Sequence, residues 1–480
     1  MRFLLYSGTT DEWIPESAGR PEYNPEYNYH LLMNDLRPLL AGLGTVTIVQ
    51  DPRTQVDAIF KTCRARAEAC AFICFTPPEF VPRDLLCPTW VVLAWSYGAI
   101  AGSQKVDGNK IDADGLRALL GGCEGAIVFS NYVARLVESA MGPAFPVSII
   151  VPPLWDRFGE AQALPVSTAQ IGVRGIVVDT HTTHFSADSL VSSVRPLEQS
   201  VQSLSKDLDE RAAEAVTAAA VQGPAKTPAP TAGAASFPAP PEIVEIPEIQ
   251  LDLRGVVYTA VFDPTDHSKN WMDMLTAFCW AFRETEDVTL VMKMASENYG
   301  AYRDFLIHYL SRLMPFKCRV IAIQAHLNDL VCEQLTAVTN YYVNTSETEV
   351  ISTPLIGFMA RGKPAIAPHH TGMEAYVDDT TSFVVQASRY LNTQPFDPRL
   401  VHQVERFRLN WESLLALYRE SYAVAKTDPA RYSAMSAAAA ERSRSLASAA
   451  ICKAKFRALF VPAVSFSAAV APNPAQSVAT

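Results

Sequence analysis

The chain has 480 residues, of which 40 are basic and 50 are acidic, so its formal net charge at pH 7 is −10. This length suggests two or three domains with large cores. The acidic balance repels phosphate backbones and anionic lipid surfaces, so we expect no nucleic-acid partner. The nine cysteines are scattered and form no C-x-x-C pair. That pattern is typical of reduced thiols in a cytoplasmic protein, and it argues against a disulfide scaffold or a zinc site.

Neither end of the sequence nor its interior predicts a membrane segment. The first residues, MRFLLYSGTTDEW, contain an apolar run that is too short for the core of a signal peptide. We expect a first β-strand there. No apolar run reaches the 18 residues that a membrane-spanning helix needs, so we predict no transmembrane segment.

Residues 1–190 alternate short apolar runs with segments of helical spacing. The predicted strands are FLLYS, VTIVQ, AFICFTP, TWVVLAW, GAIVFS and VSIIVPP. Segments such as NYHLLMNDLRPLLAGL and SNYVARLVESAM carry apolar residues at helical spacing between them. This alternation predicts an α/β domain, Rossmann-like and doubly wound around a parallel sheet.

A change of composition follows at residues 191–246. Residues 191–220 are predicted to form one exposed helix, and residues 221–242 are rich in Pro and Ala. The Pro/Ala-rich part has too little apolar surface to offset the entropy of ordering it, so we expect a disordered linker. The same composition predicts a disordered tail at residues 463–480.

A second α/β pattern occupies residues 247–395, with predicted strands RGVVYTAVF, DVTLVMKM, RVIAIQA, NYYVNTS, PAIAP and SFVVQ. Residues 396–462 are predicted to form helices only. Two Rossmann-like domains joined in this way place the ligand site in the cleft between them, at the carboxyl ends of the strands.

The stretch 344–367, NTSETEVISTPLIGFMARGKPAIA, predicts a loop, a short helix and a buried strand in succession. Thr353 is the predicted N-cap, Pro354 the first helical residue and Gly362 the helix stop. The free amides and positive dipole end of this helix are suited to holding phosphate. Glu349 precedes that end and is expected to face the ligand.

These residues resemble the retaining family 4 of GT-B fold glycosyltransferases. Residues 256–282 are similar to the family's strand, lysine loop and helix, with Lys269 at the lysine. The family also carries an acidic signature, E-x7-E. Residues 346–367 retain much of it, namely Ser346, Glu349, Pro354, Met359, Ala360, Gly362, Pro364, Ile366 and Ala367. Residues 77–155 resemble, more loosely, bacterial members that act in surface polysaccharide assembly.

The resemblance implies a metal-independent, cofactor-free transfer of a sugar from a nucleotide-sugar to a glycan, a lipid-linked acceptor or a protein. Glu349 is the expected catalytic residue and Lys269 the expected diphosphate contact. The other donor-binding candidates are Lys293, Asn344, Ser346 and the helix start at Thr353, Pro354 and Leu355. A peripheral membrane contact or a partner transferase is compatible with this reading.

The sequence also departs from the family signature. Gly357 stands where the family has its second glutamate, which binds the donor ribose, and Val350, Ile351 and Ser352 replace glycines. Two alternatives therefore stay open. One is a catalytically silent paralogue that acts as a structural or regulatory partner, and the other is a nucleotide-sugar epimerase.

Other polar motifs have simpler explanations. His369 and His370 are neighbours in a loop and have no ligand partner at metal spacing, so we expect loop residues. The same holds for His181 and His184. Asp112 and Asp114 form a D-x-D tripeptide in a polar loop that no strand leads into. We therefore predict no metal site.

Overall fold

The structure is a computed structural model that describes residues 1–8, 25–94, 104–106, 109–111, 117, 120–158, 166–182, 248–295, 299–325, 327–393 and 403–461. The predicted helix and linker at 191–246 and the predicted tail at 463–480 lie outside these residues. So do His184 and the D-x-D tripeptide. In the described part of the chain, no helix is long and apolar enough to cross a membrane.

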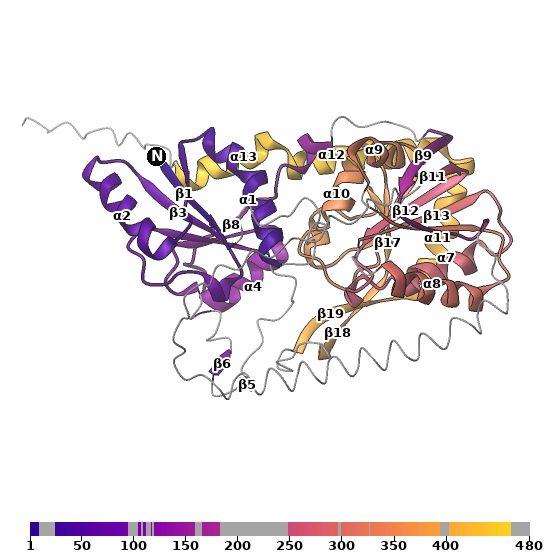
Figure 1. The fold of residues 1–480 in the computed structure, drawn as a ribbon, viewed down its shortest axis with the longest axis horizontal. Helices are drawn as coiled ribbons and strands as arrows, with labels where there is room; N and C mark the ends of the chain where they lie inside the picture. Colours follow the sequence, from indigo (N-terminus) through magenta and orange to yellow (C-terminus); the bar gives the residue numbers. More distant parts are fainter. Residues whose placement is uncertain are drawn as a thin grey trace, which may run out of the picture.

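The N-terminal domain is built on a six-stranded parallel sheet with the order β2-β1-β3-β4-β7-β8 (Figure 1). All six predicted strands are present, as β1 (Arg2–Ser7), β2 (Thr45–Ile48), β3 (Cys70–Phe75), β4 (Thr89–Leu93), β7 (Gly125–Val128) and β8 (Val147–Ile149). The helical elements of this half are α1 (Pro25–Ala41), α2 (Pro52–Ala65), η2 (Pro78–Phe80), α4 (Asn131–Met141) and α5 (Leu154–Phe158), and a small hairpin pairs β5 (Gln104–Val106) with β6 (Asn109–Ile111).

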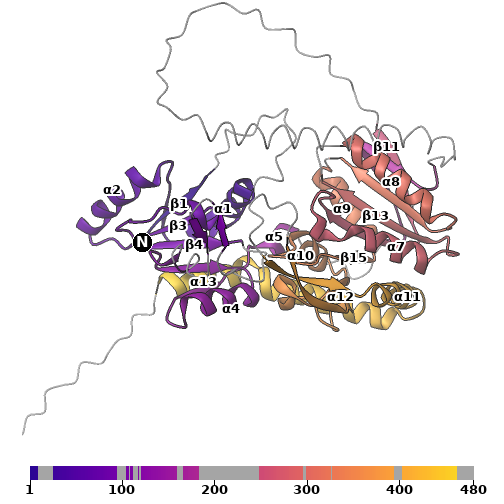
Figure 2. The same cartoon turned by 90° about the horizontal axis from the view of Figure 1, so that it is seen from below.

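Side chains of the sheet alternate between two apolar cores, as strand geometry requires. Leu4 and Phe72 point to the face covered by α2 and α4. Phe3 and Ile73 point to the other face, where α1 packs together with the last helix of the chain, α13 (Ala449–Phe460). Figures 1 and 2 show α13, in yellow, lying along the N-terminal domain. The chain therefore crosses back to its first domain at the end of the described residues.

The second sheet has seven strands in the order β10-β14-β13-β12-β15-β16-β17. The predicted strands are again all found, as β12 (Val256–Phe262), β13 (Val288–Met294), β14 (Arg319–Gln324), β15 (Tyr341–Val343), β16 (Ala365–Pro368) and β17 (Ser382–Val385). These six are parallel. One face is covered by α7 (Trp271–Ala281), α8 (Tyr299–Leu313) and α11 (Trp411–Thr427), and the other by α9 (Asp329–Val338), α10 (Thr353–Ala360) and α12 (Pro429–Ala447).

The boundary predicted at residue 190 is too late. β9 (Thr168–Arg174) pairs with β11 (Glu248–Arg254), and β10 (Ile176–Asp179) joins the second sheet antiparallel to β14. Arg319 fixes this edge by donating to both carboxylate oxygens of Asp179, at 3.1 and 2.6 Å. Residues 168–179 therefore belong to the C-terminal half, because their apolar side chains complete its core.

The prediction of helices only at residues 396–462 is also wrong in part. β18 (Ala387–Thr393) and β19 (Gln403–Leu409) form an antiparallel hairpin before the helices begin. The apolar residues of QVERFRL are spaced three and then two apart, so they do not show the strict alternation of a strand, and pairing with β18 determines its structure.

The core next to α10 contains a buried lysine. Lys363 is fully buried, and its ammonium donates to the Ala337 carbonyl at 3.1 Å. Burial lowers the pKa of Lys363 to about 8, and the Arg361 charge adds to that shift. Below pH 8 the folded protein must hold this charge out of water, which reduces its stability.

We predict that Lys363→Met stabilises the protein at pH 7. Between pH 8 and 10.5 the folded wild type loses this proton while the unfolded chain still holds it, so stability rises with pH by about 3 kcal/mol. The advantage of the variant should shrink over that range. Urea unfolding at several pH values measures the difference, and a difference that is constant with pH contradicts the prediction.

Candidate active site

Three loops meet at the carboxyl ends of β12, β15 and β16, which are neighbours in the second sheet. The loop after β12 contains η3 (His267–Lys269), the loop after β15 carries Asn344 to Ser352, and the loop after β16 leads into η4 (Thr371–Ala375). Adjacent parallel strands deliver their loops to one edge of the sheet. This topology collects the predicted residues Lys269, Asn344, Ser346 and Glu349.

Glu349 is the centre of the cluster. Only 9% of the residue is exposed, and its Oε1 accepts hydrogen bonds from Lys269 Nζ at 2.9 Å, Ser346 Oγ at 2.8 Å and Asn344 Nδ2 at 3.4 Å. Burying a carboxylate this deeply is costly unless it is hydrogen-bonded, and these three donors supply the bonds. Asn344 also orders the loop itself, because its Oδ1 accepts from the Ser346 amide at 2.8 Å.

Lys269 is held by its own loop and by the loop after β15. The Asp266 side chain caps η3 by accepting from the Ser268 amide, and the Thr345 hydroxyl donates to the Lys269 carbonyl at 2.8 Å. Desolvation lowers the pKa of Lys269, but the carboxylates of Glu349, Asp266 and Asp263 outweigh it, so the pKa lies above its usual value. The lysine is therefore a permanent cation at neutral pH.

The backbone of Glu349 is fixed by an unusual residue. Its amide donates to the Thr371 hydroxyl at 3.0 Å, and its carbonyl accepts from the Gly372 amide at 2.9 Å. Thr371 has a φ of +50°, which is rare for a β-branched residue. Strain of this kind is often kept at functional sites. A Cβ on Gly372 would lie 2.0 Å from the Val350 carbonyl oxygen, so the two loops need a glycine to pass this closely.

His369 and His370 point in different directions, as their adjacency implies. His369 is exposed and donates from Nδ1 to the Val377 carbonyl, whereas His370 is buried and stacks on Phe407 with ring centroids 4.4 Å apart. Burial lowers the pKa of His370 to about 3, so it is neutral at physiological pH.

The predicted helix exists as α10, but it begins one residue early. Ser352, not Thr353, is the N-cap, and its side chain makes no capping bond because its Oγ accepts from Asn344 Nδ2 at 3.0 Å. Pro354 has no N–H, so the amides of Thr353 and Leu355 are what the first turn offers to an anion. The Leu355 side chain itself is fully buried in the core.

Lys293 lies apart from this cluster. On β13 it alternates with Met292 and Met294, which face α7 and α8, so its side chain leaves the opposite face of the sheet. There its charge acts on Cys332 of α9, partly opposing the burial that raises the pKa of that thiol. In the described residues, no contact joins Lys293 to Lys269 or Glu349.

The β18–β19 hairpin adds residues that the sequence did not indicate. Glu347, two positions before Glu349, accepts from the Tyr390 hydroxyl at 2.7 Å and pairs with Arg406 at 3.4 Å. The Glu347 carbonyl also accepts from the Phe407 amide at 3.0 Å. Tyr390 and Arg406 thus hold the loop in place from 43 and 59 positions further along the sequence. No local sequence pattern links them to Glu347.

The departures from the family signature have structural causes here. A Cβ on Gly357 would lie 2.7 Å from the ring of Phe158, the last residue of α5, so the ring already fills the space in front of this glycine. Val350 and Ile351 pack against the core of the N-terminal domain. A glutamate at position 357 would overlap Phe158, so Gly357→Glu could place a ribose-binding carboxylate there only if that ring moved.

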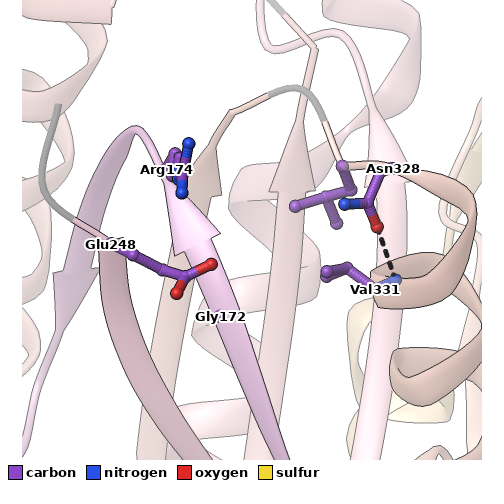
Figure 3. A pocket seen from close by; sticks show the side chains of 6 residues that line it. Gly172, Arg174, Glu248, Asn328 and Val331 are labelled. Atoms are coloured by element: carbon purple, nitrogen blue, oxygen red, sulfur yellow. Dashed lines mark hydrogen bonds between the residues drawn. The ribbon is translucent and has the colours of Figure 1, made fainter. Parts of the chain in front are cut away.

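A separate pocket of about 370 Å³ lies between the two-stranded sheet of β9 and β11 and the start of α9. Figure 3 shows it lined by Gly172, Arg174, Glu248, Asn328 and Val331, with Leu327 completing the wall. The Asn328 side chain caps α9 by accepting from the Val331 amide at 2.9 Å. No predicted site residue lines this pocket.

The comparison with known proteins identifies the fold of this chain. No protein-family model matches the sequence, and no curated protein matches it either. Sucrose-phosphate synthase from Thermosynechococcus elongatus is similar in structure, with a TM-score of 0.50 and 12% identity over 96% of this chain and 98% of that one. The chain has the GT-B fold.

Other solved structures are similar at lower TM-scores. A glycosyltransferase from Rickettsia africae ESF-5 has a TM-score of 0.49 and 9% identity, covering 96% of this chain and 97% of that one. A mutant of TarM from S. aureus, in complex with Fondaparinux, alpha-GlcNAc-glycerol and UDP, has a TM-score of 0.44 and 9% identity. The match spans 82% of this chain but only 55% of the TarM chain.

We predict that Lys269→Met destabilises the protein by about 1 to 3 kcal/mol, because it leaves the Glu349 carboxylate buried without its cation. Glu349→Gln in the same chain should recover most of this loss. Urea unfolding of the two single variants and the double variant gives the coupling free energy. Losses that simply add would contradict a direct interaction.

The contact between Gly357 and Phe158 yields a second prediction. Gly357→Ala should destabilise the wild type by about 1 to 3 kcal/mol, because the new methyl group overlaps the ring. In a Phe158→Leu background the same change should become neutral or stabilising, since alanine is the better helix former by about 1 kcal/mol. Thermal unfolding of the wild type, the two single variants and the double variant measures the effect of Gly357→Ala in each background. If the effect is the same in both backgrounds, contact with Phe158 is not its cause.

Proposed function

We propose that the chain is a glycosyltransferase that moves a sugar from a nucleotide-sugar to an acceptor with retention at the anomeric carbon. The observation that carries this proposal is the contact between Lys269 and Glu349, 2.9 Å apart at the carboxyl ends of β12 and β15 in a GT-B fold. Helix α10 begins at Thr353, shortly after Glu349 in the chain. A cation, a carboxylate and helix amides in one place suit a sugar diphosphate.

Each group has a role in this proposal. As the bond between the sugar carbon and the phosphate oxygen breaks, negative charge grows on the diphosphate and positive charge grows on the sugar. Lys269 and the amides of Thr353 and Leu355 stabilise the diphosphate, and Glu349 stabilises the sugar. Ser346 and Asn344 hold the carboxylate in place. No metal or cofactor takes part in this scheme.

The N-terminal domain holds the acceptor in this proposal, and a glycan, a lipid-linked sugar or a protein would each suit it. The pathway we propose is glycan or surface polysaccharide assembly. A cytoplasmic location fits the nine cysteines, none of which is in a disulfide. Contact with a membrane surface or with a partner transferase is compatible with this scheme.

A second function is favoured by specific features of the same loops. Three carboxylates, Asp263, Asp266 and Glu349, surround the charge of Lys269, so an incoming diphosphate must compete with them. Phe158 covers Gly357, and Val350 packs on the other domain. These features suit a catalytically silent paralogue that partners an active transferase. Product analysis separates the readings, since an epimerase would return an altered donor sugar.

Activity should be tested with Glu349→Gln on a panel of nucleotide-sugars and acceptors. We expect transfer or donor hydrolysis to fall about 100- to 1000-fold, the scale of one lost electrostatic contact in a transition state. Glu333→Gln on the surface of α9 is the matched control and should retain full activity. NMR of the product reports the anomeric configuration. Equal rates in Glu349→Gln and wild type would remove Glu349 from catalysis.

Calorimetry with nucleoside diphosphates tests the donor site without turnover. Lys269→Met should weaken binding by about 1 to 3 kcal/mol, the scale of a charge-assisted hydrogen bond, and Lys293→Met should have less effect. Unchanged affinity in Lys269→Met would place the diphosphate elsewhere. Absence of both binding and turnover across the panel would favour the silent paralogue.

A further inference from the structure

Three thiols converge at the edge of the first sheet that bears the amino ends of its strands, opposite the edge used by a GT-B cleft. Cys63 lies in the last turn of α2, Cys70 begins β3, and Cys87 precedes β4. Phe72 pairs with Thr89 in the parallel ladder, and counting back two residues on each strand places Cys70 beside Cys87. The Phe72 amide donates to the Pro88 carbonyl at 2.9 Å, which continues the ladder toward this pair.

The thiols interact with one another and not only with apolar neighbours. All three side chains belong to the same buried cluster on one face of the sheet, and Cys87 and Cys63 both act to lower the pKa of Cys70. The Asp57 carboxylate on α2 holds the loop in front of them, accepting from the amides of Leu86 and Cys87 at 2.9 and 3.2 Å. The packing of α2 against β3 and β4 therefore fixes the three sulfurs as a group.

The charge pattern makes Cys70 the sulfur that ionises. The hydrogen bond from Cys87 lowers the pKa of Cys70, burial opposes it, and the Cys63 thiol and the Arg2 guanidinium add to the lowering, so the pKa is about 7. Burial raises the pKa of Cys63 to about 11, and the hydrogen bond to Cys70 raises that of Cys87 further. Of the three thiols, Cys70 is therefore the one that loses its proton most readily.

The cluster lies close to solvent. Cys70 is 7% exposed, and Leu86, the residue next to Cys87, is 64% exposed. Among the described residues, no group of three or more His, Cys, Asp or Glu side chains is arranged to hold a metal ion. The arrangement instead suits an attacking thiolate with a resolving thiol in contact.

We propose that Cys70, which lies beside Cys87 on the neighbouring strand, reacts with a peroxide and then forms a disulfide with Cys87. The Cys70 sulfur attacks one oxygen of hydrogen peroxide, an S–O bond forms, the O–O bond breaks, and hydroxide leaves and takes up a proton to become water. The Cys87 thiol loses its proton and attacks the sulfenic sulfur. An S–S bond forms, the S–O bond breaks, and a second water leaves.

The electrons balance in this sequence, because two thiols lose two electrons and one peroxide is reduced to two waters. A reductant such as a dithiol reverses the step by thiol–disulfide exchange. The proposal is independent of the proposed glycosyl transfer, since none of its residues lies in the loops of the candidate active site.

The test uses full-length protein treated with hydrogen peroxide, blocked with iodoacetamide and digested with trypsin. Cleavage after Arg66 and Arg83 leaves Cys63, Cys70 and Cys87 on three different peptides. Mass spectrometry without reduction should find the peptide of Cys70 joined to that of Cys87, and fragmentation should place the bond at Cys70 and not at Cys74. The link should disappear after reduction with a dithiol.

Matched variants locate the reacting sulfurs. The link should be lost in Cys70→Ser, and it should survive in Cys74→Ser, whose sulfur is fully buried with a pKa raised to about 12. Unlinked peptides from peroxide-treated wild type would overturn the proposal. So would a link that persists in Cys70→Ser or that joins Cys74.

The rate at which Cys70 is alkylated can be measured in the unmodified protein. Alkylation of Cys70 should rise with pH around a midpoint near 7, set by Cys63, Cys87 and Arg2 against the nearby charge of Glu68. Asp57 acts on the neighbouring Cys87. Exposed Cys332, whose pKa is raised, should react with a midpoint above 9. A Cys70 midpoint at or above that of Cys332 would overturn the assignment of the thiolate.

Discussion

The structure of the candidate site depends on one constraint, the need to compensate the nearly buried carboxylate of Glu349. Lys269 supplies the countercharge from the loop after β12, and Ser346 and Asn344 supply neutral donors from the loop after β15. Thr371 holds the Glu349 amide from the loop after β16. Because a buried charge without partners costs several kcal/mol, none of these three loops can move far alone. The bonds to Glu349 therefore both form the candidate site and hold its three loops together at one edge of the sheet.

The two domains meet around the same loops. Val350 and Ile351 follow Glu349 directly and pack on the core of the N-terminal domain. Arg135 of α4 pairs with Glu374, three residues after Thr371, at 2.8 Å. The loop after β15 and the η4 segment after β16 therefore both contact the N-terminal domain. Any change in the relation of the domains must act on the loops that hold Glu349 and Thr371.

The sequence predicted most of this architecture and part of the site. The twelve strands that the apolar runs predicted are all present, because buried parallel strands are continuous apolar runs bounded by turn residues. Lys269 and Glu349 were expected at the site because the short motifs around them resemble those of the glycosyltransferase family. Tyr390, Arg406 and Phe158 were not, since they reach the site through tertiary contacts that no local pattern encodes. Residues 176–179 were not predicted as a strand and were placed in the first domain, because their pairing with β14 is a tertiary contact that chain order does not reveal.

The return of α13 to the first domain has a consequence for the order of synthesis. One core of the N-terminal sheet is closed by Cys452 and Phe456, and the ring of Phe460 lies 5.3 Å from that of Phe3. A ribosome makes Phe3 at the start and these residues more than 440 positions later. Until the last helix emerges, an apolar face of the first domain stays open to water. The N-terminal domain therefore cannot complete its folding until α13 has been made, long after its own strands.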